Sequence, residues 1–451
     1  MRDLAIIGFL LALLVLGLRR PFVLVLAFAY VDIVSPQRIS YYLLNSAPVA
    51  MIVASLAIGG CLLFDSKRNL SFSMRQALML VLILYAGVTT MNADFPAEAY
   101  EKWEWAWKSV FWAIFLPLTL RTKLRIEAYI LIMVLAASAI IMVGGIKTLV
   151  SGGGYGSLDL MVDNNAGLYE GSQISTVAIA IVPIILWLSR FGTVFPRDWR
   201  VRLFACGLIF ACLLMPVGTQ ARTGLVCMAV LGILMLRDVK RRLVYLGMIA
   251  LAGAAALPML PQSFTSRMET IQTYEADQSA STRLAIWAWT WEYVKERPMG
   301  GGFEAYRQNK LKVRTESSEG AGPVEVVGQQ MHDDQSRAYH SSYFEMLGEQ
   351  GFPGLILFLL IHGAGLLRME VLRRRYLGEE GADAWVPPLA TALQSAQIIY
   401  LVGSIFVGMA FQPFIYMLLG VQIGFDTLVS RRTKNAAGTT GWSKAPIAIK
   451  A

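Results

Sequence analysis

Long apolar runs separated by short polar connections dominate the chain. A membrane-spanning helix needs roughly 20 apolar residues. In lipid each backbone polar group needs a partner within the protein, so such runs predict helices rather than strands. The runs lie near residues 4–18, 21–35, 42–64, 76–92, 105–120, 126–147, 171–189, 201–219, 223–237, 242–261, 352–368, 387–411 and 413–430. This pattern predicts an all-α polytopic integral membrane protein with about 12–13 transmembrane helices.

The first two runs, 4–18 and 21–35, are shorter than the usual span of about 17–25 residues. They form either a tight hairpin or one interrupted element. Because these two readings differ by one crossing, the pattern leaves the side of the N-terminus open.

Composition narrows the class of protein. Hydrophobic residues make up 56% of the chain and charged residues 16%, against about 45–50% and about 25% in soluble proteins. A water-soluble enzyme is therefore excluded. The net charge of +9 does not indicate nucleic acid, because the basic residues are scattered in short loops. The 4 cysteines lie in apolar runs without a CxxC pair, which indicates buried side chains rather than a disulfide framework or a zinc site.

The loops alternate in charge along the chain. Basic connections occur at 19–20, 67–75, 121–125, 190–202, 237–242 and 368–375, and in the tail from Arg431. The connections between them are acidic or poor in basic residues: 36–41, 93–104, 148–170, 218–222 and 262–351. The positive-inside rule assigns the basic loops and the C-terminus to the cytoplasm and the other set to the outer face. Four regions follow: transmembrane helices over 1–261, one large outer loop over 262–351, transmembrane helices over 352–430, and a cytoplasmic tail over 431–451.

The large outer loop is the longest polar segment. Residues Ser281 to Lys295 predict an amphipathic helix whose apolar side chains lie along the membrane surface. Residues 314–336 predict an exposed flexible loop, and the stretch from Tyr339 leads into a further helix. Three tryptophans in an earlier outer loop fit an interfacial aromatic belt, with a binding platform as the alternative: Trp103, Trp105 and Trp107.

Histidine is scarce, with 3 residues in the chain. His340 stands just ahead of a span on the outer face, where a hydrophilic substrate would meet a lipid carrier. It is either a polar interfacial residue or a general base for a hydroxyl group. His332 beside Asp333 and Asp334 falls short of the three or four ligands that a metal site needs. His362 lies inside a span, as a helix-packing group or a relay residue.

Two arginines lie on the face where the positive-inside rule does not call for them. Arg222 occupies the short connection 218–224, and Arg283 opens the amphipathic helix. Guanidinium groups bind phosphate oxygens in bidentate fashion, so these arginines are candidates for holding a lipid-linked pyrophosphate. Contact with lipid headgroups is the alternative. Asp163 and Asn164, in another outer loop, either bind sugar hydroxyls or form a simple turn.

These residues resemble the pattern of the O-antigen ligase family, which also contains O-antigen polymerases and bacterial O-oligosaccharyltransferases. Four places carry the resemblance: His340-Ser341 followed after nine residues by Gly351-Phe-Pro-Gly354; Arg222 at the start of a span; Arg283-x-x-x-Trp287 with Pro298-x-Gly300-x-Gly302-Phe303; and the loop Asp163-Asn164-Asn165. The Pro-to-Gly spacing is one residue shorter than in the family pattern. The N-terminal third resembles exosortase-associated O-glycosylation ligases.

The resemblance implies a lipid-carrier-dependent (GT-C type) glycosyltransferase fold in the bacterial inner membrane, with the active site facing the periplasm. It implies inverting, metal-independent transfer of a glycan from undecaprenyl pyrophosphate to a sugar hydroxyl of lipid A-core, with no cofactor and no nucleic acid. His340 would be the general base, and Arg222 and Arg283 would neutralise the pyrophosphate. Asp163, Asn164, Ser341 and Tyr343 would contact substrate.

Two other activities remain open at this stage. A polymerase or a protein O-oligosaccharyltransferase shares the chemistry and differs in the acceptor. A transporter of the same lipid-linked glycan is disfavoured, because charged residues inside the predicted spans are few and no inverted repeat is evident.

Overall fold

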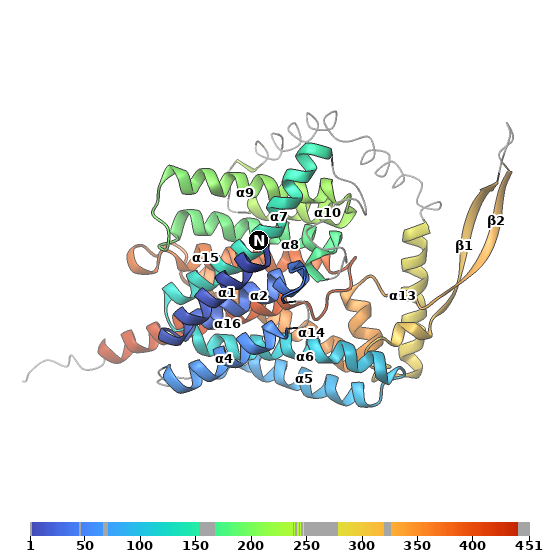
Figure 1. Cartoon of the computed structure of the whole chain (residues 1–451), viewed down its shortest axis with the longest axis horizontal. Helices are drawn as coiled ribbons and strands as arrows, with labels where there is room; N and C mark the ends of the chain where they lie inside the picture. Colours follow the sequence, from blue (N-terminus) through green and yellow to red (C-terminus); the bar gives the residue numbers. More distant parts are fainter. Residues whose placement is uncertain are drawn as a thin grey trace, which may run out of the picture.

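The computed structural model describes residues 2–44, 47–65, 71–152, 167–237, isolated positions between 239 and 247, 278–319 and 326–440. Most of these residues lie in helices that pack side by side in one bundle (Figure 1). Helices dominate because the apolar runs satisfy their own backbone hydrogen bonds only in that form. The chain is an all-α polytopic membrane protein that carries one small β-hairpin outside its bundle.

The described helices follow the predicted runs closely. In the first half they are α1 (Arg2–Arg19), α2 (Phe22–Val34), α3 (Pro36–Ile39), α4 (Val49–Phe64), α5 (Met74–Met91), α6 (Pro96–Thr119), α7 (Lys123–Ser151), η1 (Gly167–Tyr169), α8 (Gly171–Phe191), α9 (Trp199–Gly218) and α10 (Arg222–Met235). The rest comprises α13 (Gln278–Glu296), η4 (Ala305–Gln308), β1 (Lys310–Glu319), β2 (Val326–Gln335), α14 (Ser342–Arg375), η5 (Gly381–Asp383), α15 (Val386–Gly403) and α16 (Pro413–Thr440). The predicted run 242–261 lies almost entirely outside the described residues.

Length and apolarity mark a subset of these helices as membrane spans. Within the described ranges, six helices are long and apolar enough to cross a membrane, and three shorter helices are also apolar: α2, α4 and α10. The short helices are part of the same bundle, since α2 contacts α4 and α7, and α10 contacts α8 and α15.

The basic loops gather at one end of the bundle, here called the basic end. Arg75 and Arg368 both bind Asp426, at 3.3 and 2.6 Å. Three further ion pairs join loops of the same predicted side: Arg125–Asp65, Arg237–Glu370 and Arg432–Asp383. The alternation in loop charge therefore corresponds to an actual division of the bundle into two ends.

The first two helices form a hairpin, which resolves the reading left open above. Arg19 is the last residue of α1, and Arg20 lies in the turn before α2. At the start of α1 the Asp3 carboxylate accepts hydrogen bonds from the backbone N–H groups of Tyr41 and Tyr42, each at 3.0 Å. The N-terminal end of α1 thus lies with the connection 35–44, at the end of the bundle opposite the basic one.

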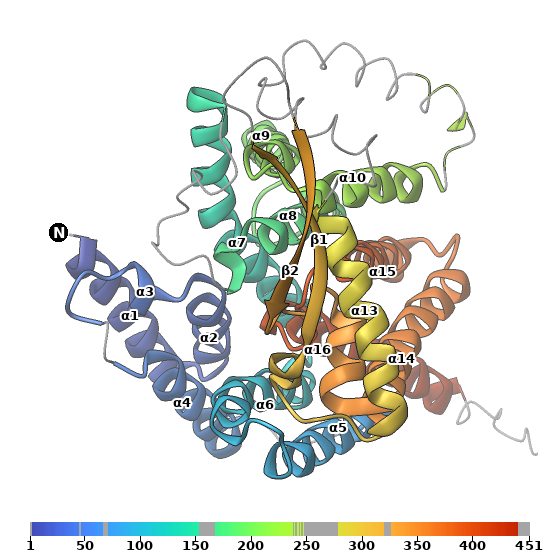
Figure 2. The same ribbon diagram turned by 90° about the vertical axis from the view of Figure 1, so that its right-hand side faces the viewer.

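At that opposite end α13 lies across the bundle axis (Figure 1). The predicted helix over Ser281 to Lys295 is confirmed, and its place along a membrane surface stays a prediction. Its apolar residues divide between two sides. Ile286 is fully buried, whereas Leu284 and Trp291 are about half exposed. Seen from that end, α13 and the hairpin lie in front of the bundle (Figure 2).

The predicted flexible loop over residues 314–336 is wrong for most of its length. Strands β1 and β2 pair antiparallel, with Lys310 opposite Gln335 and Glu319 opposite Val326. In this hairpin the backbone N–H and C=O groups of each strand find partners on the other strand. The polarity of the sequence did not reveal this pairing.

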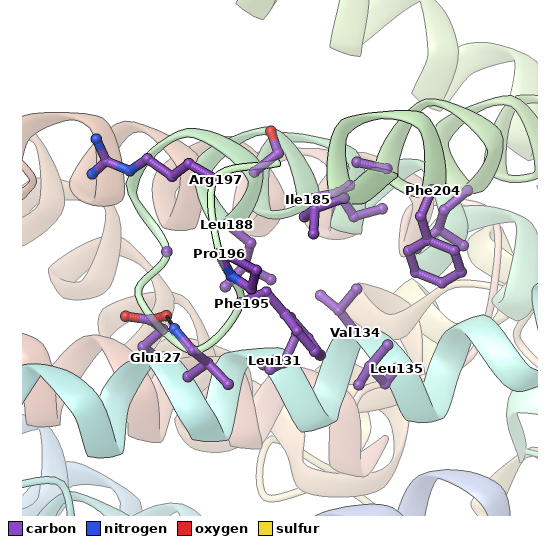
Figure 3. A pocket seen from close by; sticks show the side chains of 16 residues that line it. Glu127, Leu131, Val134, Leu135, Ile185, Leu188, Phe195, Pro196, Arg197 and Phe204 are labelled. Atoms are coloured by element: carbon purple, nitrogen blue, oxygen red, sulfur yellow. Dashed lines mark hydrogen bonds between the residues drawn. The ribbon is translucent and has the colours of Figure 1, made fainter. Parts of the chain in front are cut away.

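A small cavity near the basic end has an apolar lining. It measures about 70 Å³ and lies between α7, α8 and α9. Figure 3 shows Leu131, Val134 and Phe204 around it, with Glu127 at its rim. The Glu127 carboxylate accepts hydrogen bonds from the backbone of Thr193 and Val194, which fixes the α8–α9 loop.

Candidate functional site

His340 is held between two anchored residues at the start of α14. Its φ of 48° is left-handed, a conformation that histidine adopts more readily than most residues. Before it, Tyr339 is buried and its carbonyl accepts a hydrogen bond from Trp287 Nε1 at 2.9 Å. After it, the Ser342 hydroxyl donates to Val407 O and accepts from Met409 N. The backbone at His340 is therefore fixed while its side chain is exposed.

Helix α13 brings a positive charge to this histidine. Trp287 stacks on Phe344 of α14 with ring centroids 4.9 Å apart. Arg283 lies four residues before Trp287, on the same face of α13. Desolvation by the surrounding protein, followed by the positive charges of Arg283 and Arg337, lowers the pKa of His340. This shift favours the neutral imidazole, which is the form that can accept a proton.

Asn309 positions Arg337 from the base of the hairpin. The Asn309 side chain is fully buried. Its Oδ1 accepts from Arg337 N at 3.0 Å, and its Nδ2 donates to Arg337 O at 2.7 Å. Because both backbone groups of Arg337 are engaged, the chain leaves β2 in a fixed direction three residues before His340.

The first turns of α14 carry a buried charge cluster. Lys102 Nζ of α6 lies 2.7 Å from Glu345 Oε1 and 2.8 Å from Glu349 Oε1. Glu345 also accepts from Ala410 N, and Glu349 accepts from Glu304 N, each at 3.1 Å. One cation thus faces two carboxylates one helical turn apart, and backbone donors share the remaining charge.

The two glycine motifs of the sequence meet at a break in α14. Gly351 has φ 63° and ψ −166°, a combination restricted to glycine. The turn after α13 docks against it: Gly302 N donates to Glu349 O at 2.9 Å, and Phe352 N donates to Pro298 O at 3.0 Å. A Cβ atom on Gly300 would lie 2.5 Å from Gly351 N. The motifs around Pro298 and Gly351 therefore form one close-packed joint.

Arg222 begins α10 at the same end of the bundle as His340. The connection before it contacts α8, where Thr219 and Ser175 hydroxyls are 2.7 Å apart. On the other side of α8, Thr176 lies against Gly403 at the end of α15. The neighbouring Ser404 O accepts from Ser342 N at 2.8 Å. One turn of α8 and the end of α15 thus connect the Arg222 loop to the start of α14.

A polar cavity of about 650 Å³ opens at this end of the bundle. Glu345 and Lys102 form part of its wall, whereas His340, Arg222 and Arg283 are not among its lining residues. The other walls come from residues 32–38, 98–105, 167–173, 304–307 and 408–413. The first four of these ranges overlap connections that the sequence assigns to the outer face. The cavity is therefore adjacent to the predicted catalytic residues through α14 but distinct from them.

The remaining predicted residues have mixed placements. Asp163 and Asn164 lie outside the described residues. Ser341 is buried at the N-cap of α14, and the Tyr343 hydroxyl donates to Leu401 O at 3.0 Å. Their contacts with substrate stay predictions.

The other two histidines also have defined positions. His332 lies in β2 opposite Val313. His362 is buried in α14, where Gln397 Nε2 contacts its Nδ1 at 3.1 Å and donates to its carbonyl at 3.0 Å. Among the described residues, no three His, Cys, Asp or Glu side chains gather as a metal site would require.

Sequence reasoning missed the residues that support the site. Glu345 and Glu349 are two carboxylates at i,i+4 directly before an apolar run, and such a pair needs a cation nearby. That spacing was a usable signal for the charge cluster. Nothing local marks Lys102 or Asn309, because their partners lie far away in the sequence.

Comparisons with known proteins divide the chain into two segments. A family model described as O-antigen ligase matches residues 206–359, which include Arg222, Arg283, His340 and both glycine motifs. A model described as a family of unknown function matches residues 1–193. No curated protein matches the chain.

Proposed function

We propose that this chain, whose residues 206–359 match the O-antigen ligase family, transfers a glycan from undecaprenyl pyrophosphate to a sugar hydroxyl of lipid A-core. The family supports a membrane-bound transferase of the ligase or polymerase type that uses lipid-linked glycan and acceptor substrates. The donor, the acceptor, the inner-membrane location and the periplasmic orientation belong to the proposal. So does a GT-C type architecture.

In the proposed reaction, the acceptor hydroxyl oxygen attacks the anomeric carbon of the donor sugar. Neutral His340 takes the hydroxyl proton as the new C–O bond forms. The bond between the anomeric carbon and the pyrophosphate oxygen breaks, and undecaprenyl pyrophosphate leaves with the bonding electrons. Attack from the opposite face inverts the anomeric configuration. Arg222 and Arg283 stabilise the negative charge on the leaving group, so the step needs no metal ion.

The observation that carries this proposal is the environment of His340. It combines an exposed imidazole, a rigid backbone and a pKa lowered by its surroundings and by Arg283 and Arg337. A general base must be unprotonated to act, and an exposed position gives it access to a hydroxyl group. The arginines that favour the neutral imidazole also provide positive charge for a pyrophosphate.

Supplying the purified protein with lipid-linked glycan and one of three acceptors tests the proposal. The acceptors are lipid A-core, a second lipid-linked repeat unit and a protein rich in serine and threonine. We expect a glycosylated lipid A-core, detected as a shifted band on a gel, both with and without excess chelator. A product only with the repeat unit or the protein would replace ligase by polymerase or protein glycosylation. Absence of all three products would overturn glycan transfer.

Arg337→Gln should move the acidic limb of the pH–rate profile to higher pH. The positive charge of Arg337 contributes to the lowered pKa of His340, so its removal raises that pKa toward the ordinary value. The base is then protonated over a wider acidic range, and kcat/KM falls at mildly acidic pH while the alkaline plateau is retained. Initial rates measured between pH 5 and 8 check this. Arg200→Gln, an exposed change near the basic end, serves as control, and an unmoved limb in Arg337→Gln would exclude His340 as the titrating group.

A further inference from the structure

The 650 Å³ cavity draws most of its wall from the segment that the ligase family model does not cover. Helices α2 and α6 and the start of α8 contribute Asp32, Glu101 and Gln173, among others. These elements lie within residues 1–193, the segment matched by a family of unknown function. The volume falls within the range of about 300–1,000 Å³ typical of small-molecule sites.

Acidic groups outnumber basic groups in this cavity. Five carboxylates line it: Asp32, Glu98, Glu101, Glu304 and Glu345. Three cationic side chains also line it: Arg38, Lys102 and Arg307. Lys102 is engaged by Glu345 at 2.7 Å, and Arg307 lies 3.2 Å from Glu304 and 3.9 Å from Glu98. The net negative lining repels phosphate groups. This cavity therefore differs in its ligand preference from the arginines near His340, which attract phosphate.

Several polar groups face the cavity with acceptor capacity left over. Within the described part of the chain, Asp32 and Glu101 take part in no hydrogen bond or ion pair. The buried Gln173 Oε1 likewise accepts no hydrogen bond from the described residues. An ionised carboxylate only accepts hydrogen bonds, so a ligand that displaces water from it must donate them.

An aromatic side chain adds an apolar surface to this set. Trp105 lines the cavity and is 45% exposed. Hydroxyl groups donate to carboxylate and amide oxygens, and the C–H face of a sugar ring packs on an indole. Sugar rings meet both requirements, whereas a lipid chain would leave the carboxylates without donors.

We propose that this cavity binds neutral or amino-bearing sugar residues of the glycan that the enzyme handles. The inference rests on the proposed function for the identity of the substrate. It adds where the sugar part of that substrate binds and which charge on the sugar is preferred. The segment 1–193 then selects the sugar, while the segment 206–359 carries His340 and the arginines. Sugars with carboxyl groups are disfavoured.

Titration calorimetry of the full-length, detergent-solubilised protein with three free oligosaccharides tests the charge preference. The probes are tetramers of glucosamine, N-acetylglucosamine and galacturonic acid. We expect the first two to bind, with the amino-bearing tetramer tighter, and the acidic tetramer to bind at least tenfold more weakly. Tightest binding of the acidic tetramer, or no binding of any tetramer, would overturn the proposal.

Two variants connect the binding to named residues. Glu101→Gln keeps an acceptor but removes the charge, so glucosamine tetramer binding should weaken about tenfold and N-acetylglucosamine binding less. Trp105→Ala should weaken binding of both. The matched control is Glu104→Gln, an exposed carboxylate on the same helix that pairs with Lys108 and does not line the cavity. Equal effects of Glu101→Gln and Glu104→Gln would contradict the assignment.

The same experiment separates this inference from the proposed function. His340→Ala should bind the tetramers like the wild type, because His340 does not line the cavity. Binding without transfer activity would sustain the cavity assignment even if the general-base role fails.

In a transfer assay, a rise in the donor KM alone for Glu101→Gln assigns the bound sugar to the donor, and a rise in the acceptor KM alone assigns it to the acceptor. No rise in either would overturn the link to the glycan substrate.

Discussion

Replacement of His340 by alanine should leave a folded, membrane-inserted protein that has lost glycan transfer by about 10²–10⁴-fold. The histidine side chain is exposed, so truncation removes little packing. What it removes is the only group that the proposal assigns to take the acceptor proton. Transfer is measured as the amount of glycosylated acceptor per unit of purified protein.

The variant His340→Asn tests whether the loss of transfer in His340→Ala comes from a folding defect. Asparagine tolerates the left-handed backbone at φ 48° but does not act as a base near neutral pH. Both variants should therefore lose transfer equally, and His332→Ala in β2 should keep it. Wild-type rates in His340→Asn would remove histidine from the chemistry.

Gly351→Ala should be among the most destabilising single changes in the chain. Its φ and ψ lie in a region that only glycine occupies without strain. An added Cβ would also overlap the carbonyl oxygen of Pro298, which accepts the Phe352 N–H. Strain and displacement of the docked turn together should lower the free energy of unfolding by about 3 kcal/mol or more. The thermal unfolding midpoint in detergent reports this loss.

The matched control lies three turns further along α14. A Cβ added at Gly363 meets no atom within 4 Å, so Gly363→Ala should be neutral or slightly stabilising. If both alanine variants unfold at the wild-type temperature, the joint between Pro298 and Gly351 does not contribute to stability. A large loss in Gly363→Ala would instead indicate that α14 tolerates no substitution.

Hydrophobic runs predicted the helices well because each run satisfies its own backbone in lipid. Even the short first runs became helices, and the Arg19–Arg20 turn follows their spacing. The hairpin β1–β2 was missed because its pairing joins residues across a polar segment with no apolar period to mark it. Loop charge reflects position relative to the membrane, and it therefore predicted which connections share an end of the bundle.

The candidate site was predicted only where single residues stand out. His340 and the outer-face arginines differ from their surroundings in type and location, and after desolvation the positive charge of Arg283 contributes to the lowered pKa of His340. The residues that shape the site do not stand out in this way. Lys102 contacts Glu345 across 243 positions of sequence, and Asn309 contacts Arg337 across 28. Such pairs follow from the packing of helices rather than from any local pattern.

The hydrogen bonds of Asp3 bear on how many times the chain crosses the membrane. They hold the start of α1 at the end of the bundle opposite the basic end, where the 650 Å³ cavity opens. Arg432, near the end of α16, binds Asp383 at the basic end. A chain that starts and finishes on opposite sides makes an odd number of passes. The apolar runs allow 12 or 13 passes, and we expect 13, because only an odd number places the start of α1 and the end of α16 on opposite sides.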